Sequence, residues 1–390
     1  MRVAISALSV KPDQTGGGET VLRNLLPVLP AADPAIEYAL FVSGENRHLF
    51  AGLPPSFVLH EAPVWALSPG RRVVCEFLWL PRRLKRLRVD LFFAVNQIFA
   101  PWMPCRVSAL VQNLFYYQYR DFGHRYPLGS LATRSLRHRL YAGLGGVCNR
   151  RAAHVVAVSE CVREMVVAED GLPGDKVHVA PLALSSAQRC AAAPEAVARV
   201  RDQVGRPFLL YVGALAPYKN IDRALTAMAR PEMRERGLAL VCIGLDHWGY
   251  GHRLRQHSQD LALGDAALFV PALPHGELSA WYAAAEGRVL LSSCEAFPLT
   301  PFEAMAQGVP VIASNRSSVP EIVGPAGLVV DPDDAGAVAT AFIQVCDDRA
   351  RCNALVEAGR ARIAQFDWVR TADQLVRLWR AEMDRDSASI

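Results

Sequence analysis

The chain has 390 residues, of which 51% are hydrophobic and 21% charged, and its formal net charge is +4. This composition is typical of a folded globular protein and excludes a disordered chain. The length exceeds that of one ordinary hydrophobic core and predicts about two domains, and no apolar run reaches the roughly 18–20 residues of a membrane span.

Charge and cysteine usage restrict the partners and the location that we expect. Residues 1–190 contain 22 Lys and Arg against 14 Asp and Glu, whereas residues 191–390 contain 20 against 24. We therefore expect only the first half to face an anionic partner. The nine cysteines never form Cys-x-x-Cys, which favours a reducing, cytoplasmic location without disulfides or structural zinc.

In the first half of the chain, short apolar runs alternate with helical patterns. The opening run, VAISALSV, precedes the glycine-rich turn TGGGET and the amphipathic segment TVLRNLLPVL. Strands and helices in alternation predict a parallel sheet that is covered on both faces. The strands that we predict here are 3–10, 38–43, 89–96, 107–113 and 154–159.

A stretch rich in Ala, Ser and Gln, residues 183–206, marks the predicted domain boundary. We assign residues 1–188 to one Rossmann-like domain and 205–368 to a second, and we expect a final helix, 369–390, to pack back on the first domain. The fold class is α/β, with two parallel sheets facing each other across a cleft and ligands beyond the carboxyl ends of the strands. The strands predicted in the second half are 208–215, 238–244, 267–273, 287–293, 309–314 and 326–332.

Two glutamates, Glu295 and Glu303, flank an apolar segment that follows a predicted strand. Thr300 suits the N-cap of a helix and Pro301 its first position, so Thr-x-x-Glu reads as a capping box. Glu303 therefore has either a structural role or a ligand-binding one. Glu295 lies in a strand-end loop beside a helix N-terminus that favours phosphate, where an ionised carboxylate suits sugar or ribose hydroxyls.

These glutamates form a Glu-x7-Glu pattern, and the following EAMAQGVPVIASNRSSVPEIVGPAGLVVDPDD resembles the C-terminal region of the retaining glycosyltransferases of family 4, the group 1 family with the GT-B fold. YVGALAPYKN resembles the phosphate loop of that family, and RAAHVVAVSECVREMV resembles its last N-domain strand and helix. The resemblance implies that the second domain binds a nucleotide-diphosphate sugar and that the first lies on the acceptor side. It further implies sugar transfer to an acceptor hydroxyl with retention of configuration, without a cofactor or an aspartate-bound metal, in surface polysaccharide or glycolipid biosynthesis, for example as a mannosyl-, glucosyl- or rhamnosyltransferase.

The same resemblance implies roles for individual residues. Glu295 is then the catalytic residue, in contact with the donor sugar near its reacting carbon, and Glu303 holds the ribose of the nucleotide. Lys219 neutralises the diphosphate, for which a compact ammonium is well suited. Gly17 and Gly18, in the turn TGGGET, cover the diphosphate or the acceptor. The remaining donor-binding residues that the resemblance implies are Gly213, Phe297, Pro298, Leu299 and Thr300.

The chain departs from the pattern of this family at three places. Ala214 and Tyr218 stand where many relatives carry an arginine, so the diphosphate depends more on Lys219, on helix N-termini and on an arginine from elsewhere. Gln112 and Asn113 replace a strand-end His-Asp pair; because neither is a useful general base, we expect them to hydrogen-bond the sugar or the acceptor. APLALS replaces the usual Asn-Gly or His-Gly after the last N-domain strand.

The basic and aromatic segment RRVVCEFLWLPRRLKRLRVDLFF, residues 71–93, has two interpretations. It is either a solvated helix face or a peripheral contact with the anionic inner face of the cell membrane. We expect no nucleic-acid partner, because no stacking platform or recognition module accompanies the charge.

Other functions remain open at this point. The chain fits a nucleotide-sugar epimerase or a phosphorylase of the same fold, and also a catalytically silent subunit that binds a nucleotide sugar. An NAD-dependent Rossmann oxidoreductase is disfavoured, because TGGGET lacks the Gly-x-Gly-x-x-Gly spacing.

Overall fold

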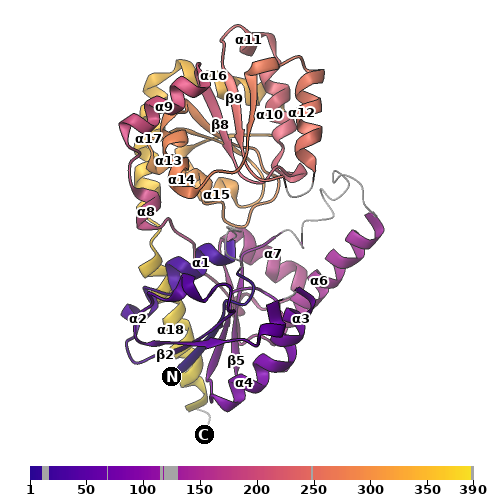
Figure 1. Cartoon of the computed structure of the whole chain (residues 1–390), viewed down its shortest axis with the longest axis vertical. Helices are drawn as coiled ribbons and strands as arrows, with labels where there is room; N and C mark the ends of the chain where they lie inside the picture. The colour runs from indigo at the N-terminus through magenta and orange to yellow at the C-terminus, as the bar shows by residue number, and fades with distance from the viewer. Residues whose placement is uncertain (11–16, 68, 115–116, 118–130, 247–248, 388–390) are drawn as a thin grey trace. The chain divides into compact units, whose positions relative to one another are not determined.

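The structure is a computed structural model that describes residues 1–10, 17–67, 69–114, 117, 131–246 and 249–387 (Figure 1). The chain divides into two compact units. Unit 1 comprises residues 1–117, 137–182 and 367–390, and unit 2 comprises residues 118–136 and 183–366. Within the described ranges, no helix combines the length and the apolar character needed to cross a membrane.

Unit 1 is built on a seven-stranded sheet in the order β3-β2-β1-β4-β5-β6-β7, in which every neighbouring pair is parallel. The central strand β4 (Leu91–Ala94) is buried along its whole length, because helices cover both faces of a parallel sheet. The other strands are β1 (Arg2–Ser6), β2 (Glu37–Val42), β3 (Phe57–Glu61), β5 (Arg106–Val111), β6 (His154–Ala157) and β7 (Val177–Val179).

Two strands of this sheet, β3 and β7, are not among the predicted ones. Both lie at the edges of the sheet. Val58 in β3 is 56% exposed, and β7 has three residues. A long apolar run indicates a strand buried on both faces, and an edge strand needs neither the length nor the continuous apolarity.

The last helix of the chain belongs to unit 1. Helix α18 (Trp368–Ser387) packs against α1 (Gly17–Leu25) and α2 (Leu29–Ala32) (Figure 1). Trp379 is fully buried, and its ring centroid lies 5.3 Å from that of Phe93 in β4. The core of unit 1 is therefore completed by residues that follow the whole of unit 2 in the sequence. The other α-helices that the structure describes before residue 183 are α3 (Pro69–Val74), α4 (Leu80–Arg86), α6 (Leu131–Arg151) and α7 (Glu160–Asp170).

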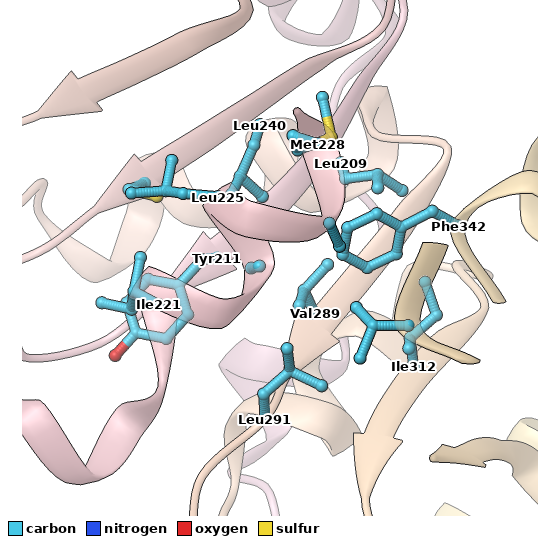
Figure 2. Close-up of a cluster of buried hydrophobic side chains, with 14 of the residues drawn as sticks. Leu209, Tyr211, Ile221, Leu225, Met228, Leu240, Val289, Leu291, Ile312 and Phe342 are labelled. Carbon is cyan, nitrogen blue, oxygen red and sulfur yellow. The ribbon is translucent and has the colours of Figure 1, made fainter. Parts of the chain in front are cut away.

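Unit 2 is built on a six-stranded parallel sheet in the order β10-β9-β8-β11-β12-β13. Leu209, Leu225 and Phe342 belong to its buried core, in which helix residues pack on the strands (Figure 2). The strands are β8 (Phe208–Val212), β9 (Ala239–Ile243), β10 (Ala267–Val270), β11 (Gly287–Leu290), β12 (Val311–Ser314) and β13 (Gly327–Val330).

The strand order of unit 2 reverses at β8, which has β9 on one side and β11 on the other. The loops that follow two such strands diverge, and ligands of open α/β sheets bind at this switch point. The helices around the sheet are α9 (Pro194–Val204), α10 (Ile221–Met228), α11 (Pro231–Arg234), α12 (Tyr250–Asp260), α13 (His275–Ala284), α14 (Thr300–Ala306), α15 (Val319–Val323), α16 (Ala335–Asp347) and α17 (Arg349–Ile363).

The predicted boundary segment, residues 183–206, lies within unit 2. It contains α8 (Ser186–Arg189), which begins with a capping box between Ser185 and Gln188. It also contains α9, which packs against α13. The segment is thus an ordered part of the second unit.

Candidate active site

Two loops at the switch point of unit 2 carry most of the predicted donor-binding residues. Residues 213–220 follow β8, and residues 291–299 follow β11 and lead into α14. Gly213 has a φ of +148°, a conformation that strains other residues. A Cβ on Gly244, in the loop after β9, would lie 1.7 Å from the carbonyl oxygen of Gly213. Glycine at positions 213 and 244 therefore lets the loop after β8 and the loop after β9 come into close contact.

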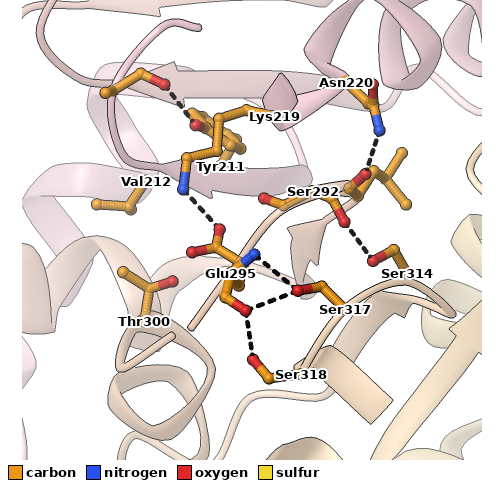
Figure 3. Close-up of polar contacts among 12 residues, drawn as sticks. Tyr211, Val212, Lys219, Asn220, Ser292, Glu295, Thr300, Ser314, Ser317 and Ser318 are labelled. Carbon is orange, nitrogen blue, oxygen red and sulfur yellow. Dashed lines mark hydrogen bonds and ion pairs between the residues drawn. The ribbon is translucent and has the colours of Figure 1, made fainter. Parts of the chain in front are cut away.

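The predicted phosphate-binding lysine and the predicted catalytic glutamate form an ion pair (Figure 3). Lys219 Nζ lies 2.5 Å from Glu295 Oε1, and each side chain is 14% exposed. The ammonium also lies 4.8 Å from the ring centroid of Tyr218. Burial opposes the charge of Lys219, but the Glu295 carboxylate outweighs it and raises the pKa of the lysine. Lys219 therefore stays charged at neutral pH, with its ammonium facing the Glu295 carboxylate.

Asn220 fastens the two loops together. It adopts a left-handed conformation and is fully buried. Its Nδ2 donates to Leu291 O and to Ser293 Oγ, both at 2.7 Å. The amide of Ser293 donates to Tyr218 O at 2.8 Å. The loop that carries Lys219 is therefore held against the loop that carries Glu295.

Two serines that precede α15 hold the backbone of Glu295 (Figure 3). Ser317 Oγ and Ser318 Oγ donate to Glu295 O at 2.7 and 2.8 Å, and Glu295 N donates to Ser317 Oγ at 3.2 Å. Sequence reasoning assigned no role to this pair. The feature of the sequence that could have indicated this role is the Ser-Ser dipeptide in NRSSVPEIV. It follows β12, the strand beside β11.

Glu303 is buried, with 6% of the residue exposed, and both of its carboxylate oxygens accept hydrogen bonds. Gln188 Nε2 donates to Oε1 and Tyr282 Oη donates to Oε2, each at 2.7 Å. Burial, and then the charge of Glu303, raise the pKa of Tyr282 well above its usual range. Tyr282 is thus held as a neutral donor to the carboxylate.

The predicted capping box at the start of α14 is wrong. Leu299 is the N-cap residue and makes no side-chain cap, and Thr300 is the first helical residue. The Thr300 hydroxyl accepts a hydrogen bond from Arg288 instead. Glu303 turns away from the helix start toward the half-buried Gln188 and the buried Tyr282, because these donors satisfy its buried carboxylate.

Aromatic packing fixes the loop between the two glutamates. The Phe297 ring lies 5.7 Å from the rings of both Phe302 and Phe366. Phe297 and Pro298 are buried, and Leu299 is half-buried. The structure therefore brings Lys219, Glu295 and these loop residues to one edge of unit 2, with Glu303 on the adjoining helix.

In unit 1, the predicted glycines and one amide lie together. Gly17 and Gly18 begin α1, and a Cβ on Gly17 would lie 3.3 Å from Gln112 Oε1. Gln112 Nε2 donates to Val95 O at 3.0 Å, whereas its buried Oε1 has no partner among the described residues. Asn113 follows in the loop after β5. Residues 15 and 16 of the turn TGGGET lie outside the described residues.

The acidic clusters of the chain do not form a metal site among the described residues. The chain contains two Asp-x-Asp triplets, Asp331-Pro-Asp333 and Asp384-Arg-Asp386. Both carboxylates of the first triplet form ion pairs with Arg316, and Asp333 also pairs with Arg223. In the described part of the chain, no three His, Cys, Asp or Glu side chains gather as a metal site would require.

Solved structures share this architecture. Sucrose-phosphate synthase from Thermosynechococcus elongatus matches with a TM-score of 0.75 and 22% identity, over 98% of this chain and 99% of that one. HepE from Anabaena, in a complex with UDP-glucose, matches with a TM-score of 0.72 and 18% identity, over 98% and 100% of the two chains. Two Rossmann-like units with parallel sheets of this kind define the GT-B class of glycosyltransferase folds.

Sequence comparison then gives the family. The model described as glycosyl transferases group 1 matches residues 194–362, and the model described as glycosyltransferase family 4 matches residues 15–186. The chain belongs to the group 1 glycosyltransferases of family 4.

Curated relatives match over part of their length. O-antigen chain mannosyltransferase B of Escherichia coli is 30% identical over 58% of this chain and 60% of its own. D-inositol 3-phosphate glycosyltransferase of Thermobispora bispora is 33% identical over 50% of this chain and 48% of its own. The chain thus spans about half the length of the curated relatives that it matches.

Proposed function

We propose that the protein is a retaining glycosyltransferase that moves a sugar from a nucleotide-diphosphate sugar to an acceptor hydroxyl without a metal ion. The observation that carries the proposal is the contact of Lys219 with Glu295 at the switch point of unit 2, beside the helix that bears Glu303. Support comes from family membership and from the UDP-glucose complex of the similarly folded HepE.

The ion pair suits a donor that carries both charge and hydroxyls. An ammonium has three donors, so Lys219 can keep its ion pair with Glu295 while it donates to the diphosphate. Positive charge placed where the leaving diphosphate gains negative charge stabilises the transition state. Glu295 then accepts hydrogen bonds from the sugar, and the acceptor attacks on the face from which the diphosphate departs.

Glu303 keeps the capacity to hold a ribose. Each carboxylate oxygen accepts two hydrogen bonds, and one position on each is taken by Gln188 or Tyr282. These two donors fix the orientation of the carboxylate before a ligand arrives. Preorganisation of this kind increases affinity because it lowers the cost of ordering the site on binding.

The test combines nucleotide binding with turnover. We expect one of UDP, GDP, dTDP or ADP to raise the melting temperature, and the matching nucleotide sugars to be hydrolysed slowly in the absence of an acceptor. Transfer to an acceptor hydroxyl without added phosphate argues against an epimerase and a phosphorylase. Turnover that survives in Glu295→Ala would contradict the proposal. Nucleotide binding by the wild type without any turnover would also contradict it and would indicate a catalytically silent subunit.

We further propose that the acceptor is a glycan or a lipid-linked glycan of surface polysaccharide or glycolipid biosynthesis. The match to an O-antigen chain mannosyltransferase supports a mannosyl-type donor, with glucosyl- and rhamnosyl-type donors as the alternatives. Chromatography of products formed with lipid-linked glycan acceptors tests this proposal, and transfer restricted to free small molecules would contradict it.

A peripheral contact with the anionic inner face of the cell membrane is also proposed, through unit 1. Large apolar side chains are exposed around α3 and the π-helical turn Cys75–Trp79, with Trp102 58% exposed and donating through Nε1 to Phe77 O. On α4, Arg82, Arg83 and Arg86 line a pocket of about 230 Å³. Flotation with liposomes should need anionic lipid and weaken with salt; binding that is absent at low salt would remove this proposal.

A further inference from the structure

A fully buried arginine lies in the middle of strand β11. Arg288 has an exposed fraction of 0%, and the strand around it, GRVL, is otherwise buried and apolar. Burial of a guanidinium costs free energy unless an anion or sufficient hydrogen bonds compensate for the lost water. The partners of Arg288 therefore indicate why the strand keeps a cation.

Those partners are all neutral. The guanidinium donates to Val212 O at 2.9 Å, to Leu210 O at 3.4 Å and to Val289 O, and it donates to Thr300 Oγ1 at 2.9 Å. Its Nε is buried and has no acceptor among the described residues. These acceptors are neutral, and Arg288 also interacts with the hydroxyl of Tyr282, which in turn donates to the carboxylate of Glu303.

The charge sits between the two loops of the candidate donor site. Val212 is the last residue of β8, and Thr300 is the first residue of α14 after the loop that carries Glu295. The guanidinium carbon lies 5.3 Å from the ring centroid of Tyr211, a ring on which the charge of Lys219 also acts. Arg288 is therefore a second cation at the edge of the sheet where Lys219 stands.

Thr300 links the buried Arg288 to the surface of the candidate site through a hydrogen bond. Its hydroxyl accepts from Arg288, so its own proton is available for donation to another group. Within the described ranges, no acceptor for that proton is present, and the residue is half-buried rather than enclosed. Figure 3 shows Thr300 beside Glu295 and Val212 at the candidate site. The arrangement leaves a polarised O–H that is suited to an anionic ligand.

We propose that Arg288 is a positioning residue that supplies positive charge beneath the diphosphate of the donor and orients the Thr300 hydroxyl to donate to it. This inference rests on the proposed function. The loop after β8, residues 213–220, contains one cation, Lys219, and that cation is already paired with Glu295. Two phosphate groups need more positive charge than this pair leaves, and a nearby charge in a weakly solvated site acts strongly.

The alternative is that Arg288 ties β8 to α14 and has no effect on the ligand. A purely structural role predicts lower stability, with equal losses of affinity for every ligand. A role toward the diphosphate predicts a loss that depends on the charge of the ligand. Binding of a nucleoside diphosphate and of its matching nucleoside, measured by calorimetry on the full chain, separates the two.

The experiment uses Arg288→Met, Arg288→Lys and Thr300→Val, with Arg253→Met as the control. Arg253 is an exposed residue of α12 in the same unit. We expect Arg288→Met to weaken the diphosphate by about tenfold or more, the scale of one charge-assisted hydrogen bond, with the nucleoside changed by about twofold at most. Arg288→Lys should retain part of the affinity, and the control should match the wild type.

Thr300→Val keeps the inference testable if Arg288→Met does not fold, because Thr300 is half-buried and valine has the same shape. It should weaken the diphosphate selectively, and in the double variant with Arg288→Lys the two losses should be less than additive, because one acts through the other. Equal weakening of nucleoside and diphosphate, or unchanged diphosphate affinity in Thr300→Val and Arg288→Lys, overturns the inference alone. A wild-type protein that binds none of the nucleoside diphosphates overturns the proposed function as well.

Discussion

The two units have the same kind of sheet but different chemistry at their switch points. In unit 1 the order reverses at β1, and the described side chains near the start of α1 include two amides, Gln112 and Asn96, and the carboxylate Glu19, which pairs with Arg23 of the same helix. In unit 2 the corresponding edge holds Lys219, Glu295 and the buried Arg288. The topology decides where a ligand lies, and the loop side chains decide which ligand it is.

The difference also shows what net charge does not reveal. Residues 1–190 carry the excess of basic residues, and they were expected to face an anionic partner. Yet the cations suited to a diphosphate lie in unit 2, within the half in which acidic residues outnumber basic ones. A few partly or fully buried charges act on a ligand more strongly than many solvated ones, which salt screens.

Removal of the charge at Glu295 should give the largest effect. We expect Glu295→Gln to lower the turnover of a nucleotide sugar by about 100- to 1000-fold, as loss of one electrostatic contact in a transition state does. Glu277→Gln, an exposed change on α13, is the control. Steady-state kinetics measures the effect. Turnover within about fivefold of the wild type would show that the charged switch point is not the reaction site.

Lowering the pH should reduce the free energy of unfolding through a buried histidine of unit 1. Burial first, and then the charge of His178, lower the pKa of His154 in unit 1 to about 4. A histidine whose folded pKa lies below its unfolded value of about 6.5 loses stability as the pH falls through that interval. Arg385 and Lys176 also act on the ring in the same direction. Between pH 7.5 and pH 5 we expect a loss of about 2 kcal/mol from this residue.

Denaturant unfolding at the two pH values measures that loss. His154→Leu should remove it, whereas His252→Leu, an exposed change on α12 of unit 2, should not. An equal pH dependence in both variants would contradict the assignment to His154.

Glu303 tests whether the donor nucleotide is held by unit 2. We expect Glu303→Gln to weaken a nucleoside diphosphate by about tenfold, because a neutral amide replaces a charged acceptor. Tyr282→Phe, which removes one donor to the carboxylate, should have a smaller effect of about threefold. Isothermal calorimetry measures both. If Glu303→Gln lowers the melting temperature and leaves the affinity unchanged, the residue has a structural role.

The amide Gln112 at the switch point of unit 1 should give the smallest effect. Gln112→Ala removes one neutral hydrogen-bonding group, and we expect the acceptor KM to rise by about fivefold while the affinity for the nucleoside diphosphate is unchanged. Asn24→Ala, on the same helix as Gly17 and Gly18, is the control. A loss of nucleotide affinity in Gln112→Ala would contradict the division of roles between the units.

Much of the fold was predictable because periodicity reports burial. All six strands of unit 2 fall in predicted apolar runs, and so do the five inner strands of unit 1. The strands β3 and β7 were not predicted, because β3 is mostly half-buried or exposed and ends in His60 and Glu61 and β7 has three residues, so neither forms a long apolar run. The edge strands β10 and β13 of unit 2 do lie in such runs. The start of α14 was predicted one residue too late, with Thr300 rather than Leu299 as the N-cap, and the Thr300 hydroxyl is taken by a competing donor, Arg288.

Several of the residues predicted for the donor site lie together in unit 2, whereas their contacts with one another could not be predicted from the sequence. Glu295 and Lys219 were assigned separate partners, and their ion pair depends on two loops that lie 76 positions apart in the sequence. Arg288 carried no signal, since one basic residue in an apolar strand fits no motif. The partners of Glu303 come from α8 and α13, and their approach depends on packing that a linear pattern does not encode.

Helix α18 determines the order in which the two units can complete folding during synthesis, because it belongs to unit 1 and is translated last. Its tryptophan, Trp379, fills the interior beside Phe93, so the first unit to be translated waits for the final stretch of polypeptide before its interior closes. Unit 2 emerges whole in the meantime. A nascent chain halted before residue 368 would expose apolar surface in unit 1, and such surface attracts chaperones and aggregates.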